Sequence, residues 1–406
     1  MSLNNTPSAQ RTHIAFFGCR NAGKSSLINA VTGQNLAIVS EVKGTTTDPV
    51  EKTMELLPLG PVRIIDTPGI DDEGELGLLR IQKTRQVLDK TDLAVLVVDG
   101  QNGTTSSDRQ LLTLFQEKNI PYLVVYNKKD LWNTSSPEQG ETILGVSAVT
   151  GEGIHELKER MAALAKQQEP PRRLFADLAD SGDLIILVTP IDSAAPKGRL
   201  ILSQQQAIRD LLEIGALSVV TQVPQLAAAI ESLPKPPRLV VTDSQAFQEV
   251  AAIVPDPIPL TSFSILFARY KGLLSEAVKG AKALDNIRTG DRILIAEGCT
   301  HHRQCEDIGT VKLPNWIRRY TGAEPEFSFT SGGEFPQDLR DYQLIVHCGG
   351  CMLNEREMKY RMKCAHDQGI PITNYGITIA YIQGILRRSV EPFPEIAALL
   401  YGSREG

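Results

Sequence analysis

The segment that most constrains the fold of this 406-residue chain is 18–25, with the sequence GCRNAGKS. It matches the pattern G-x-x-x-x-G-K-S, follows the apolar run 14–17 and begins a stretch with helical spacing, 24–31. A strand, a glycine-rich turn and a helix in this order direct backbone N–H groups and the positive end of a helix dipole toward phosphate oxygens. The sequence therefore predicts a phosphate-binding loop in a parallel α/β domain.

Apolar runs alternate with helical patterns along the first 170 residues, which predicts a parallel sheet with helices on its faces. The predicted strands there are 14–17, 62–65, 93–98, 122–126 and 143–146, and the predicted helices include 24–31 and 111–118. A middle segment repeats the pattern with strands at 184–188, 218–221 and 239–242 and helices at 208–214 and 224–230. The last segment has candidate strands at 293–296, 344–346 and 370–373. The predicted fold class is α/β throughout.

Two proline-rich clusters, 167–173 and 254–259, divide the chain into three predicted domains, 1–170, 171–262 and 263–406. At about 150 residues per domain, the length of the chain also predicts two or three domains. The middle domain contains neither cysteine nor histidine, and it has no glycine-rich loop. We interpret it as a structural or self-association domain.

Residues near the phosphate-binding loop are candidates for binding a nucleotide with Mg²⁺. Lys24 is expected to reach the β- and γ-phosphates, and the Ser25 hydroxyl is expected to ligate Mg²⁺. The motif DTPG follows the strand 62–65, which places Asp66 near Mg²⁺ and the Gly69 N–H near the γ-phosphate. One of the threonines 45–47 would complete the Mg²⁺ shell, and Thr47 is the candidate.

Two further motifs favour guanine over adenine. The sequence NKKD at 127–130 follows a predicted strand, and the Asp130 carboxylate can accept hydrogen bonds from both N1–H and the exocyclic amine of guanine. Ser147 and Ala148 follow the next strand and can supply a backbone N–H to the guanine O6. The predicted nucleotide-binding residues are Gly18, Asn21, Ala22, Gly23, Lys24, Ser25, Ser26, Asn127, Lys128, Asp130, Ser147 and Ala148.

In this order, each at a strand end, the motifs resemble the translation-factor class of P-loop GTPases over about residues 10–165. Asn21 and the sequence GTT at 44–46 resemble the potassium-dependent TrmE/Era-like branch, which includes tRNA-modifying and ribosome-assembly GTPases. That resemblance implies that Asn21 ligates K⁺ where other GTPases insert an arginine; a turn-forming role for Asn21 is the alternative. Ile70 stands where Ras-like enzymes keep a water-orienting glutamine, so we expect slow GTP hydrolysis that K⁺ or self-association stimulates.

A second group of candidate ligands lies in the last third of the chain. The sequence CTH at 299–301 follows the predicted strand 293–296, and HCGGC at 347–351 follows the strand 344–346. Loops that leave the carboxyl ends of parallel strands converge on one edge of the sheet. The strand 370–373 would bring Asn374 and Tyr375 to the same edge, where they could surround the ligands.

The residue types alone leave two metal chemistries open. Three thiolates and a histidine suit a closed structural zinc site, whereas three thiolates with a labile fourth position suit an iron–sulfur cluster. Buried structural cysteines with incidental histidines are a further alternative, which fits Cys364 and Cys305 better than the two motifs.

The combination of a GTPase domain, a middle domain without chemistry and the motif C-x-H…H-C-x-x-C resembles the HydF family, the maturation GTPases of FeFe-hydrogenases. The resemblance implies a P-loop GTPase domain (1–170), a dimerisation domain (171–262) and a domain (263–406) that binds a 4Fe–4S cluster on Cys299, Cys348 and Cys351. His301 and His347 would be the fourth ligand or nearby support.

The same resemblance implies a cytoplasmic scaffold or carrier that uses GTP/GDP, magnesium, potassium and the 4Fe–4S cluster. Its expected partners are two radical-SAM maturases, which make a diiron precursor, and the apo-FeFe-hydrogenase, which receives it. Self-association as a homodimer or a higher homo-oligomer through residues 171–262 is also expected.

Composition bears on the alternative functions. The formal net charge of −6, without a basic stripe interleaved with aromatics, counts against an RNA-associated GTPase with structural zinc. The segment 312–320, KLPNWIRRY, comes nearest to such a stripe, and a solvated amphipathic helix explains it equally well. A dithiol redox enzyme would leave Cys299 and both histidines without roles. No apolar run of 18 residues and no signal-like N-terminus occur, so we expect no membrane association and a cytoplasmic protein.

Overall fold

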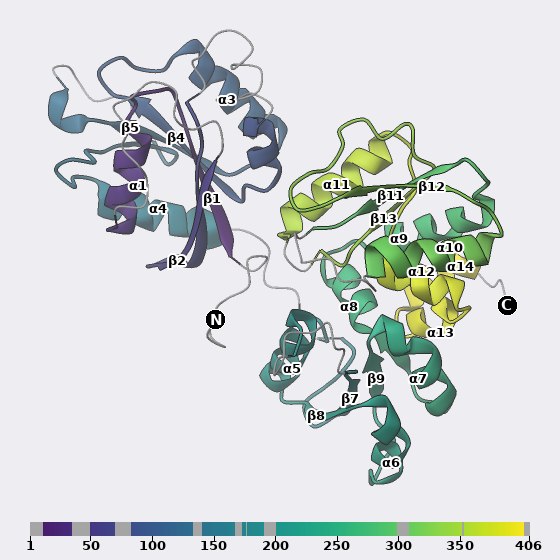
Figure 1. The fold of residues 1–406 in the computed structure, drawn as a ribbon. Helices are drawn as coiled ribbons and strands as arrows, with labels where there is room; N and C mark the ends of the chain where they lie inside the picture. Colours follow the sequence, from purple (N-terminus) through teal and green to yellow (C-terminus); the bar gives the residue numbers. More distant parts are fainter. Residues whose placement is uncertain are drawn as a thin grey trace. The chain divides into compact units, whose positions relative to one another are not determined.

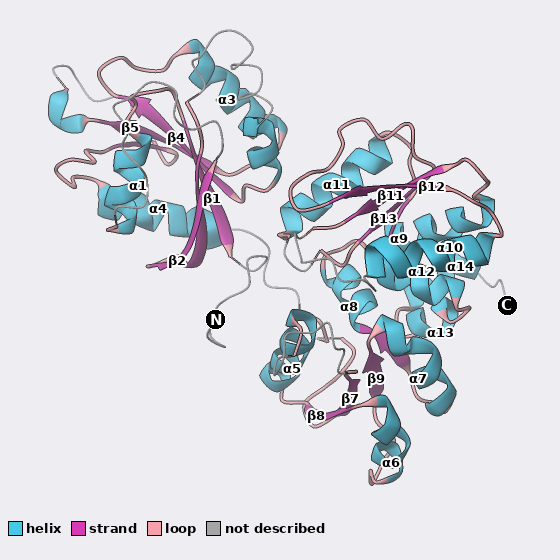
Figure 2. Cartoon of the chain, viewed as in Figure 1, coloured by secondary structure: helices cyan, strands magenta, loops and turns pink. Residues whose placement is uncertain are grey.

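The computed structural model describes residues 11–34, 49–69, 83–132, 140–166, 173–175, 177–190, 200–298, 308–350 and 353–401. The chain divides into two compact units, Met1–Pro170 and Pro171–Gly406, and each is described by itself (Figure 1). All the sheets are covered by helices, which confirms the predicted α/β class (Figure 2).

The first unit contains a six-stranded sheet in the order β2-β3-β1-β4-β5-β6. Its strands are β1 (Thr12–Phe17), β2 (Val50–Leu56), β3 (Gly60–Asp66), β4 (Leu93–Asp99), β5 (Tyr122–Asn127) and β6 (Ile143–Gly145). The five predicted strands are present and parallel, whereas β2 pairs antiparallel with β3 at the edge of the sheet. The sequence did not predict β2 because this edge strand, VEKTMEL, is largely solvent-accessible and has no continuous apolar run.

Helices cover both faces of this sheet. The helices α1 (Lys24–Thr32) and α4 (Ile154–Lys166) share a core with the side chains of Val95 and Val97. The helix α3 (Ser106–Glu117) packs on the other face, in a core that includes Ala94 and Leu96. Neighbouring residues of β4 point into two different cores, so both faces of the strand are buried. Its sequence is therefore one uninterrupted apolar run. The carboxyl ends of the parallel strands carry the loops after Phe17, Asp66, Asn127 and Gly145.

The second unit contains two four-stranded sheets, and every pair of strands in them is parallel. The first has the order β10-β9-β7-β8 and is formed by β7 (Leu184–Val188), β8 (Leu217–Thr221), β9 (Leu239–Thr242) and β10 (Leu260–Ser262). Its helices are α5 (Leu202–Ile214), α6 (Leu226–Glu231) and α7 (Phe247–Ile253), with 3-10 turns η3 (Val223–Gln225) and η4 (Ser244–Ala246). The three strands predicted here are confirmed, and the three-residue β10 was too short for the sequence pattern to indicate.

The other sheet has the order β12-β11-β13-β14 and is formed by β11 (Arg292–Ala296), β12 (Glu326–Thr330), β13 (Leu344–His347) and β14 (Ile372–Asn374). Its surroundings are α8 (Phe263–Tyr270), α9 (Leu274–Ala281), α10 (Leu313–Thr321), α11 (Glu355–Asp367), α12 (Tyr375–Ile382), α13 (Leu386–Val390) and α14 (Pro394–Tyr401), with short turns η5 (Lys282–Asn286) and η6 (Ile308–Lys312). The edge strand β12 was not predicted, since its side chains are only partly buried.

One hydrophobic core runs from the first of these sheets to the helices that surround the second. Phe247 and Leu260 share this core with Phe263 of α8, Ile377 of α12 and Val390 of α13. The predicted domain boundary between residues 262 and 263 lies between β10 and α8, two elements that both contribute to this continuous core. The domain limits of the sequence analysis therefore stay a prediction, whereas the division after Pro170 marks two separate compact units.

The strand register places three chain segments at one edge of the second sheet. Ala296 of β11 lies opposite His347 of β13, and His347 lies opposite Asn374 of β14. His347 is thus the last residue of its strand, one position beyond the predicted strand 344–346. Because the strands are parallel, the chain leaves all three at the same edge, as the sequence indicated.

Candidate functional site

The loop between β1 and α1 has the backbone of a phosphate-binding loop. Gly18 has φ of +136°, and a Cβ at this position would lie 2.1 Å from the carbonyl oxygen of Val97. Asn21 and Gly23 also have positive φ values, +62° and +87°. The helix α1 begins directly after Gly23 without a side-chain hydrogen bond to cap it. The first N–H groups of this helix therefore face the loop, as binding of an anion requires.

Lys24 lies under this loop and is almost fully buried. Its Nζ donates hydrogen bonds to the carbonyl oxygens of Gly18 at 2.7 Å and Cys19 at 2.9 Å. The ammonium group is thus held within the loop that would surround the phosphates. Ser26, the second residue after Lys24, lies partly buried in the first turn of α1.

The two side chains expected to bind Mg²⁺ lie next to each other. Ser25 Oγ donates a hydrogen bond to Asp66 Oδ2 at 3.2 Å, from the start of α1 to the end of β3. Burial raises the pKa of Asp66 above its ordinary value, although the charge of Lys24 and the hydrogen bond from Ser25 oppose this shift. A partly buried carboxylate beside a hydroxyl provides the oxygen ligands that Mg²⁺ prefers. Thr47 and Ile70 lie outside the described residues.

Thr67 fixes the DTPG segment against β1. Its backbone N–H and its hydroxyl both donate to the carbonyl oxygen of Phe16, at 3.3 Å and 2.6 Å. Phe16 lies directly opposite Asp66 in the strand register. This anchor fixes Asp66 and the start of the chain toward Gly69 relative to the phosphate-binding loop.

Asn127 connects the phosphate-binding loop to the loops expected to bind the base. Its Nδ2 donates to the carbonyl oxygens of Ala22 at 3.1 Å and Gly23 at 3.4 Å, and its Oδ1 accepts from the Ala148 N–H at 3.1 Å. The side chain is buried, and a Cβ on Gly23 would lie only 2.3 Å from its Nδ2. The structure thus uses Asn127 as a brace, and its direct contact with the nucleotide stays a prediction.

The carboxylate expected to recognise guanine is oriented by a neighbouring hydroxyl. Ser147 Oγ donates to Asp130 Oδ1 and itself accepts a hydrogen bond from the Thr150 N–H at 3.1 Å. Lys128 has φ of +64°, and its ammonium group donates to Asp99 Oδ2 at 2.7 Å. Burial acts to raise the pKa of Asp99, but the hydrogen bond from Lys128 and further donors hold it below its ordinary value. Asp130 is exposed, so its carboxylate is accessible to a base.

Trp132 supports this region, although no sequence motif indicated it. Its Nε1 donates to the carbonyl oxygen of Asn127 at 3.3 Å. A Cβ on Gly100 would lie 1.9 Å from the Trp132 ring, and one on Gly145 would lie 2.5 Å from it. The two glycines therefore leave room for the indole, which supports the backbone of the NKKD segment. Only the rarity of tryptophan, two residues in the chain, could have drawn attention to it.

At the edge of the second sheet in the other unit, Cys348 Sγ accepts two backbone hydrogen bonds. The donors are the N–H groups of Gly298 at 3.0 Å and Gly350 at 3.4 Å. These glycines directly precede Cys299 and Cys351, which lie outside the described residues together with His301 and Cys305. Among the residues that the structure describes, no three His, Cys, Asp or Glu side chains form a group that could hold a metal ion. Two N–H donors favour negative charge on the Cys348 sulfur, as a thiolate ligand requires.

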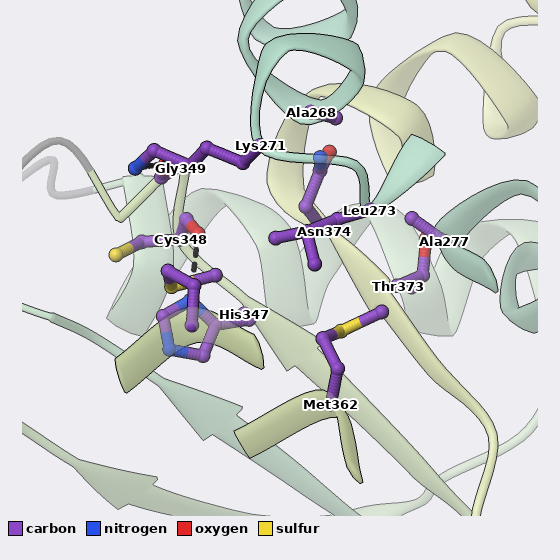
Figure 3. Close-up of a pocket in the computed structure, with 11 residues that line it drawn as sticks. Ala268, Lys271, Leu273, Ala277, His347, Cys348, Gly349, Met362, Thr373 and Asn374 are labelled. Carbon is purple, nitrogen blue, oxygen red and sulfur yellow. Dashed lines mark hydrogen bonds between the residues drawn. The ribbon is translucent and has the colours of Figure 1, made fainter. Parts of the chain in front are cut away.

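A buried cation lies beside the same loop. Lys271, at the end of α8, donates from Nζ to the carbonyl oxygens of Gly350 at 2.5 Å and Gly349 at 3.3 Å. Figure 3 shows Lys271 on one side of Cys348 and His347 on the other. These residues line a small pocket with Thr373 and Asn374. Among the residues that the structure describes, the buried Thr373 Oγ1 has no hydrogen-bond partner.

His347 and the residues around Asn374 lie at this edge, as the sequence predicted. The His347 ring is buried, with Nδ1 2.7 Å from the Cys348 carbonyl oxygen and Nε2 3.0 Å from Arg361 Nη1. Asn374 Oδ1 accepts from the Ile377 N–H at 2.8 Å and caps α12, and the Tyr375 hydroxyl donates to Glu297 Oε1 at 3.1 Å. Cys364, on α11, packs beside a hydrophobic core that includes Ile345 of β13 and Ile372 of β14.

Three family models match the chain. They are "50S ribosome-binding GTPase" over residues 13–128, "Hydrogen maturase F dimerization domain" over 174–272 and "Hydrogen maturase F tetramerization domain" over 275–392. The two hydrogen maturase F models together cover more than half of the chain.

Curated relatives include tRNA modification GTPases MnmE. The protein from Laribacter hongkongensis is 34% identical over 167 residues, which are 40% of this chain and 37% of that protein. The protein from Aquifex aeolicus is 36% identical over 178 residues, 43% of this chain and 37% of that protein. The protein from Heliobacterium modesticaldum is 40% identical over 150 residues, 35% and 32% of the two chains. The chain thus spans about a third of the length of these relatives.

Solved structures that are similar include a probable GTP-binding protein engB, at 25% identity and a TM-score of 0.32, covering 38% of this chain and all of that one. A variant of Era from Aquifex aeolicus bound to GDP.AlF4- has 21% identity and a TM-score of 0.35, and covers 52% of this chain and 92% of the other.

The family model and the relatives establish the first unit as a GTP-hydrolysing domain. The predicted P-loop GTPase, with GTP or GDP and Mg²⁺ as its ligands, is therefore confirmed at this level. The other two models establish a chain that assembles with copies of itself. No helix in the described part of the chain combines the length and the hydrophobicity needed to span a bilayer.

Proposed function

Because this chain belongs to the hydrogen maturase F family, we propose that it carries the diiron precursor of the FeFe-hydrogenase H-cluster beside a 4Fe–4S cluster. Family membership makes the chain a hydrogenase maturation GTPase. In the proposed function it receives the precursor from two radical-SAM maturases and transfers it to the apo-hydrogenase. The cytoplasm is the proposed location, since a reducing compartment keeps the cysteine thiols available.

The observation that carries this proposal is the environment of Cys348. Its sulfur accepts hydrogen bonds from the N–H groups of Gly298 and Gly350, the residues that directly precede Cys299 and Cys351 in the sequence. The Lys271 ammonium group contacts the carbonyl oxygens of the same loop. Backbone N–H donors and a nearby cation both offset the negative charge of cluster-bound thiolates. Cys299, Cys348 and Cys351 are the proposed ligands.

The donor set fits zinc as well as iron and sulfur, and family membership favours the cluster. A cluster with three cysteine ligands keeps one coordination position available for exchange, which suits a carrier. The group would supply a site for an incoming iron unit, while the chain supplies the thiolates, the N–H donors and the buried Lys271. A closed zinc site has no such position.

GTP acts as a switch in this proposal. The Lys24 ammonium group gives up its hydrogen bonds to the loop carbonyl groups and binds the β- and γ-phosphates instead. Ser25 and Asp66 bind Mg²⁺. Thr47 completes the Mg²⁺ shell, and Asn21, exposed at the turn of the loop, binds K⁺. In this proposal the γ-phosphate orders the segment that contains Thr47, and hydrolysis releases that segment. This change would determine which partner docks. K⁺ would raise the slow rate of GTP hydrolysis.

The decisive experiment is anaerobic reconstitution with iron and sulfide, followed by metal analysis and an EPR spectrum of the reduced protein. We expect close to four irons per chain and a cluster signal that disappears in Cys299→Ala, Cys348→Ala and Cys351→Ala. Cys364→Ala is the matched control, because Cys364 packs beside the hydrophobic core that includes Ile345 and Ile372, and it should keep the signal. One tightly bound zinc per chain without an EPR signal would overturn the proposal and favour an RNA-associated GTPase with structural zinc.

A further inference from the structure

We propose that Arg361 is a positioning residue that fixes His347 as its Nδ1–H tautomer, so that His347 supports the metal-binding loop and does not ligate the cluster. The statement about the cluster rests on the proposed function; the statement about Arg361 and the tautomer does not.

Arg361 is buried at an unusual place for an arginine. It lies on α11 with 1% of its surface exposed. Its Nη2 donates to the Gly332 carbonyl oxygen and to Glu357 Oε1, both at 2.7 Å, and its guanidinium lies 5.2 Å from the centroid of the Phe335 ring. Glu357, one helical turn earlier, is itself buried and balances the charge. A buried charge with this many partners is costly to move, so the guanidinium is a fixed part of the site.

The contact with His347 determines where the imidazole proton lies. Arg361 Nη1 is 3.0 Å from His347 Nε2. A guanidinium has only donors, so Nε2 accepts this hydrogen bond and has no proton of its own. The proton of the neutral ring is then on Nδ1, which donates to the Cys348 carbonyl oxygen at 2.7 Å.

This arrangement leaves His347 without a lone pair for a metal. Nδ1 carries the proton, and the lone pair of Nε2 points at the guanidinium. Ligation through either nitrogen would break a buried hydrogen bond, and ligation through Nε2 would also leave an Nη1 donor of the buried guanidinium without an acceptor. We therefore assign the fourth position of the proposed cluster to a group other than His347.

The same contacts give His347 a positioning role. Its Nδ1–H fixes the carbonyl group of Cys348, whose sulfur accepts the N–H groups of Gly298 and Gly350. Lys271 holds the next two carbonyl groups of the loop. Figure 3 shows the loop between these two side chains, with the hydrogen bond from His347 to Cys348 dashed. The backbone of residues 348–350 is thus held by His347, itself fixed by Arg361, on one side and by Lys271 on the other.

The first test reads the tautomer in the full-length, cluster-free, reduced protein labelled with ¹⁵N-histidine. We expect a protonated Nδ1 and an unprotonated Nε2 for His347, with its resonances assigned by their absence in His347→Gln. In Arg361→Met, which removes the donor but keeps an unbranched side chain, the Nε2–H tautomer should become populated. Arg361→Lys should restore part of the original tautomer, because an ammonium group is also only a donor.

Arg388→Met is the matched control. Arg388 also donates to backbone carbonyls, those of Ala251 at 2.8 Å and Val254 at 2.6 Å, but it does not contact His347 in the structure. Its substitution should leave the His347 tautomer unchanged. A wild-type His347 in the Nε2–H form, or an Arg361→Met spectrum identical to that of the wild type, would overturn the assignment. The wild-type spectrum decides the question even if Arg361→Met does not fold.

The second test measures nitrogen hyperfine couplings in the EPR spectrum of the reconstituted, reduced protein. Any histidine nitrogen coupled to the cluster should persist with the same strength in His347→Gln. Its loss in that variant, with the iron content unchanged, would show that His347 is a ligand and would refute the second half of the proposal. If the protein binds no iron, the proposed function fails, whereas the tautomer measurement still judges the role of Arg361.

Discussion

Asn127 Oδ1 accepts a hydrogen bond from the Ala148 N–H at 3.1 Å, which connects the loop after β5 to the loop after β6. The same amide donates to the phosphate-binding loop through Nδ2. One buried side chain therefore connects the phosphate-binding loop to the loops expected to recognise the base. We therefore expect the protein to preorganise the two regions relative to each other before the nucleotide binds.

We predict that Asn127→Ala weakens the binding of GTP and GDP to a similar degree. The substitution leaves the carbonyl groups of Ala22 and Gly23 and the N–H of Ala148 without their partner, at about 1–3 kcal/mol for each unsatisfied group. The affinity for both nucleotides should fall by about tenfold or more, and Tm should fall as well. Calorimetric titration and thermal unfolding measure both effects. Asn102→Ala is a suitable control because Asn102 is exposed and its amide donates to Asp99. An equal loss of affinity in that variant would contradict the prediction.

A second prediction concerns the stability of the nucleotide-free protein. Because burial raises the pKa of Asp66, the folded state binds a proton more readily than the unfolded state. The charged form of Asp66 therefore destabilises the fold at pH values above its folded pKa, and this destabilisation disappears as the pH falls below its unfolded pKa. Asp66→Asn should raise Tm at pH 7 in the absence of Mg²⁺, and the gain should shrink as the pH is lowered.

The same variant should lose Mg²⁺-dependent GTP binding, because the amide cannot supply the charge that the cation needs. Thermal unfolding at pH 7 and at a series of lower pH values down to the ordinary pKa of an aspartate measures the first effect. Nucleotide titration with and without Mg²⁺ measures the second. A lower Tm for Asp66→Asn at pH 7 would show that the Ser25 hydrogen bond and the Lys24 charge outweigh burial.

The elements that sequence patterns predict are those whose burial is uniform. The run 93–98 is apolar because β4 is buried on both faces, so it could be recognised without the structure. The pattern failed for β2 and β12, which lie at sheet edges and bury only some of their side chains. An edge strand needs few apolar residues, so its sequence resembles that of a loop.

The candidate site likewise contains some residues that local sequence motifs indicate and others that only the folded structure brings together. The positions of Lys24, Ser25 and Asp66 could be predicted because these residues stand in motifs at strand ends. Lys271 could not be predicted, because it contacts Gly350 only in the folded chain. The two residues are 79 positions apart in the sequence. Arg361 has the helical spacing to Glu357 of an ordinary surface ion pair, and nothing in the sequence indicates that it is buried against His347.

A third prediction separates support of the base-binding loop from recognition of the base. Trp132→Leu removes the hydrogen bond to the Asn127 carbonyl oxygen and leaves a cavity over Gly100 and Gly145. The affinity for GTP should fall by about tenfold, whereas the preference for GTP over xanthosine triphosphate should persist. Asp130→Asn should instead change that preference, because an amide can donate to the xanthine 2-oxo group, where the carboxylate can only accept. Competition binding with both nucleotides measures the ratio; a changed ratio in Trp132→Leu would show that Trp132 affects recognition itself.

The last prediction concerns the charge next to the proposed cluster. Lys271 is 6% exposed and contacts the carbonyl groups of Gly349 and Gly350, so its positive charge acts on the loop with little screening by water. A cluster gains negative charge when it is reduced, and a nearby cation stabilises the reduced form. Lys271→Met should therefore shift the reduction potential of the reconstituted cluster to a more negative value. It should also lower Tm, because two carbonyl groups lose a donor, at about 1–3 kcal/mol each.

Lys279→Met provides the matched control for this measurement. Lys279 lies on the neighbouring helix α9, and its ammonium group is exposed and paired with Glu276 at 2.8 Å. Removal of an exposed, paired charge should leave the potential nearly unchanged, because solvent screens it. A redox titration monitored by EPR compares the two variants with the wild type. Equal shifts in both would mean that the potential responds to net charge alone, and the buried position of Lys271 would then have no specific effect on the cluster.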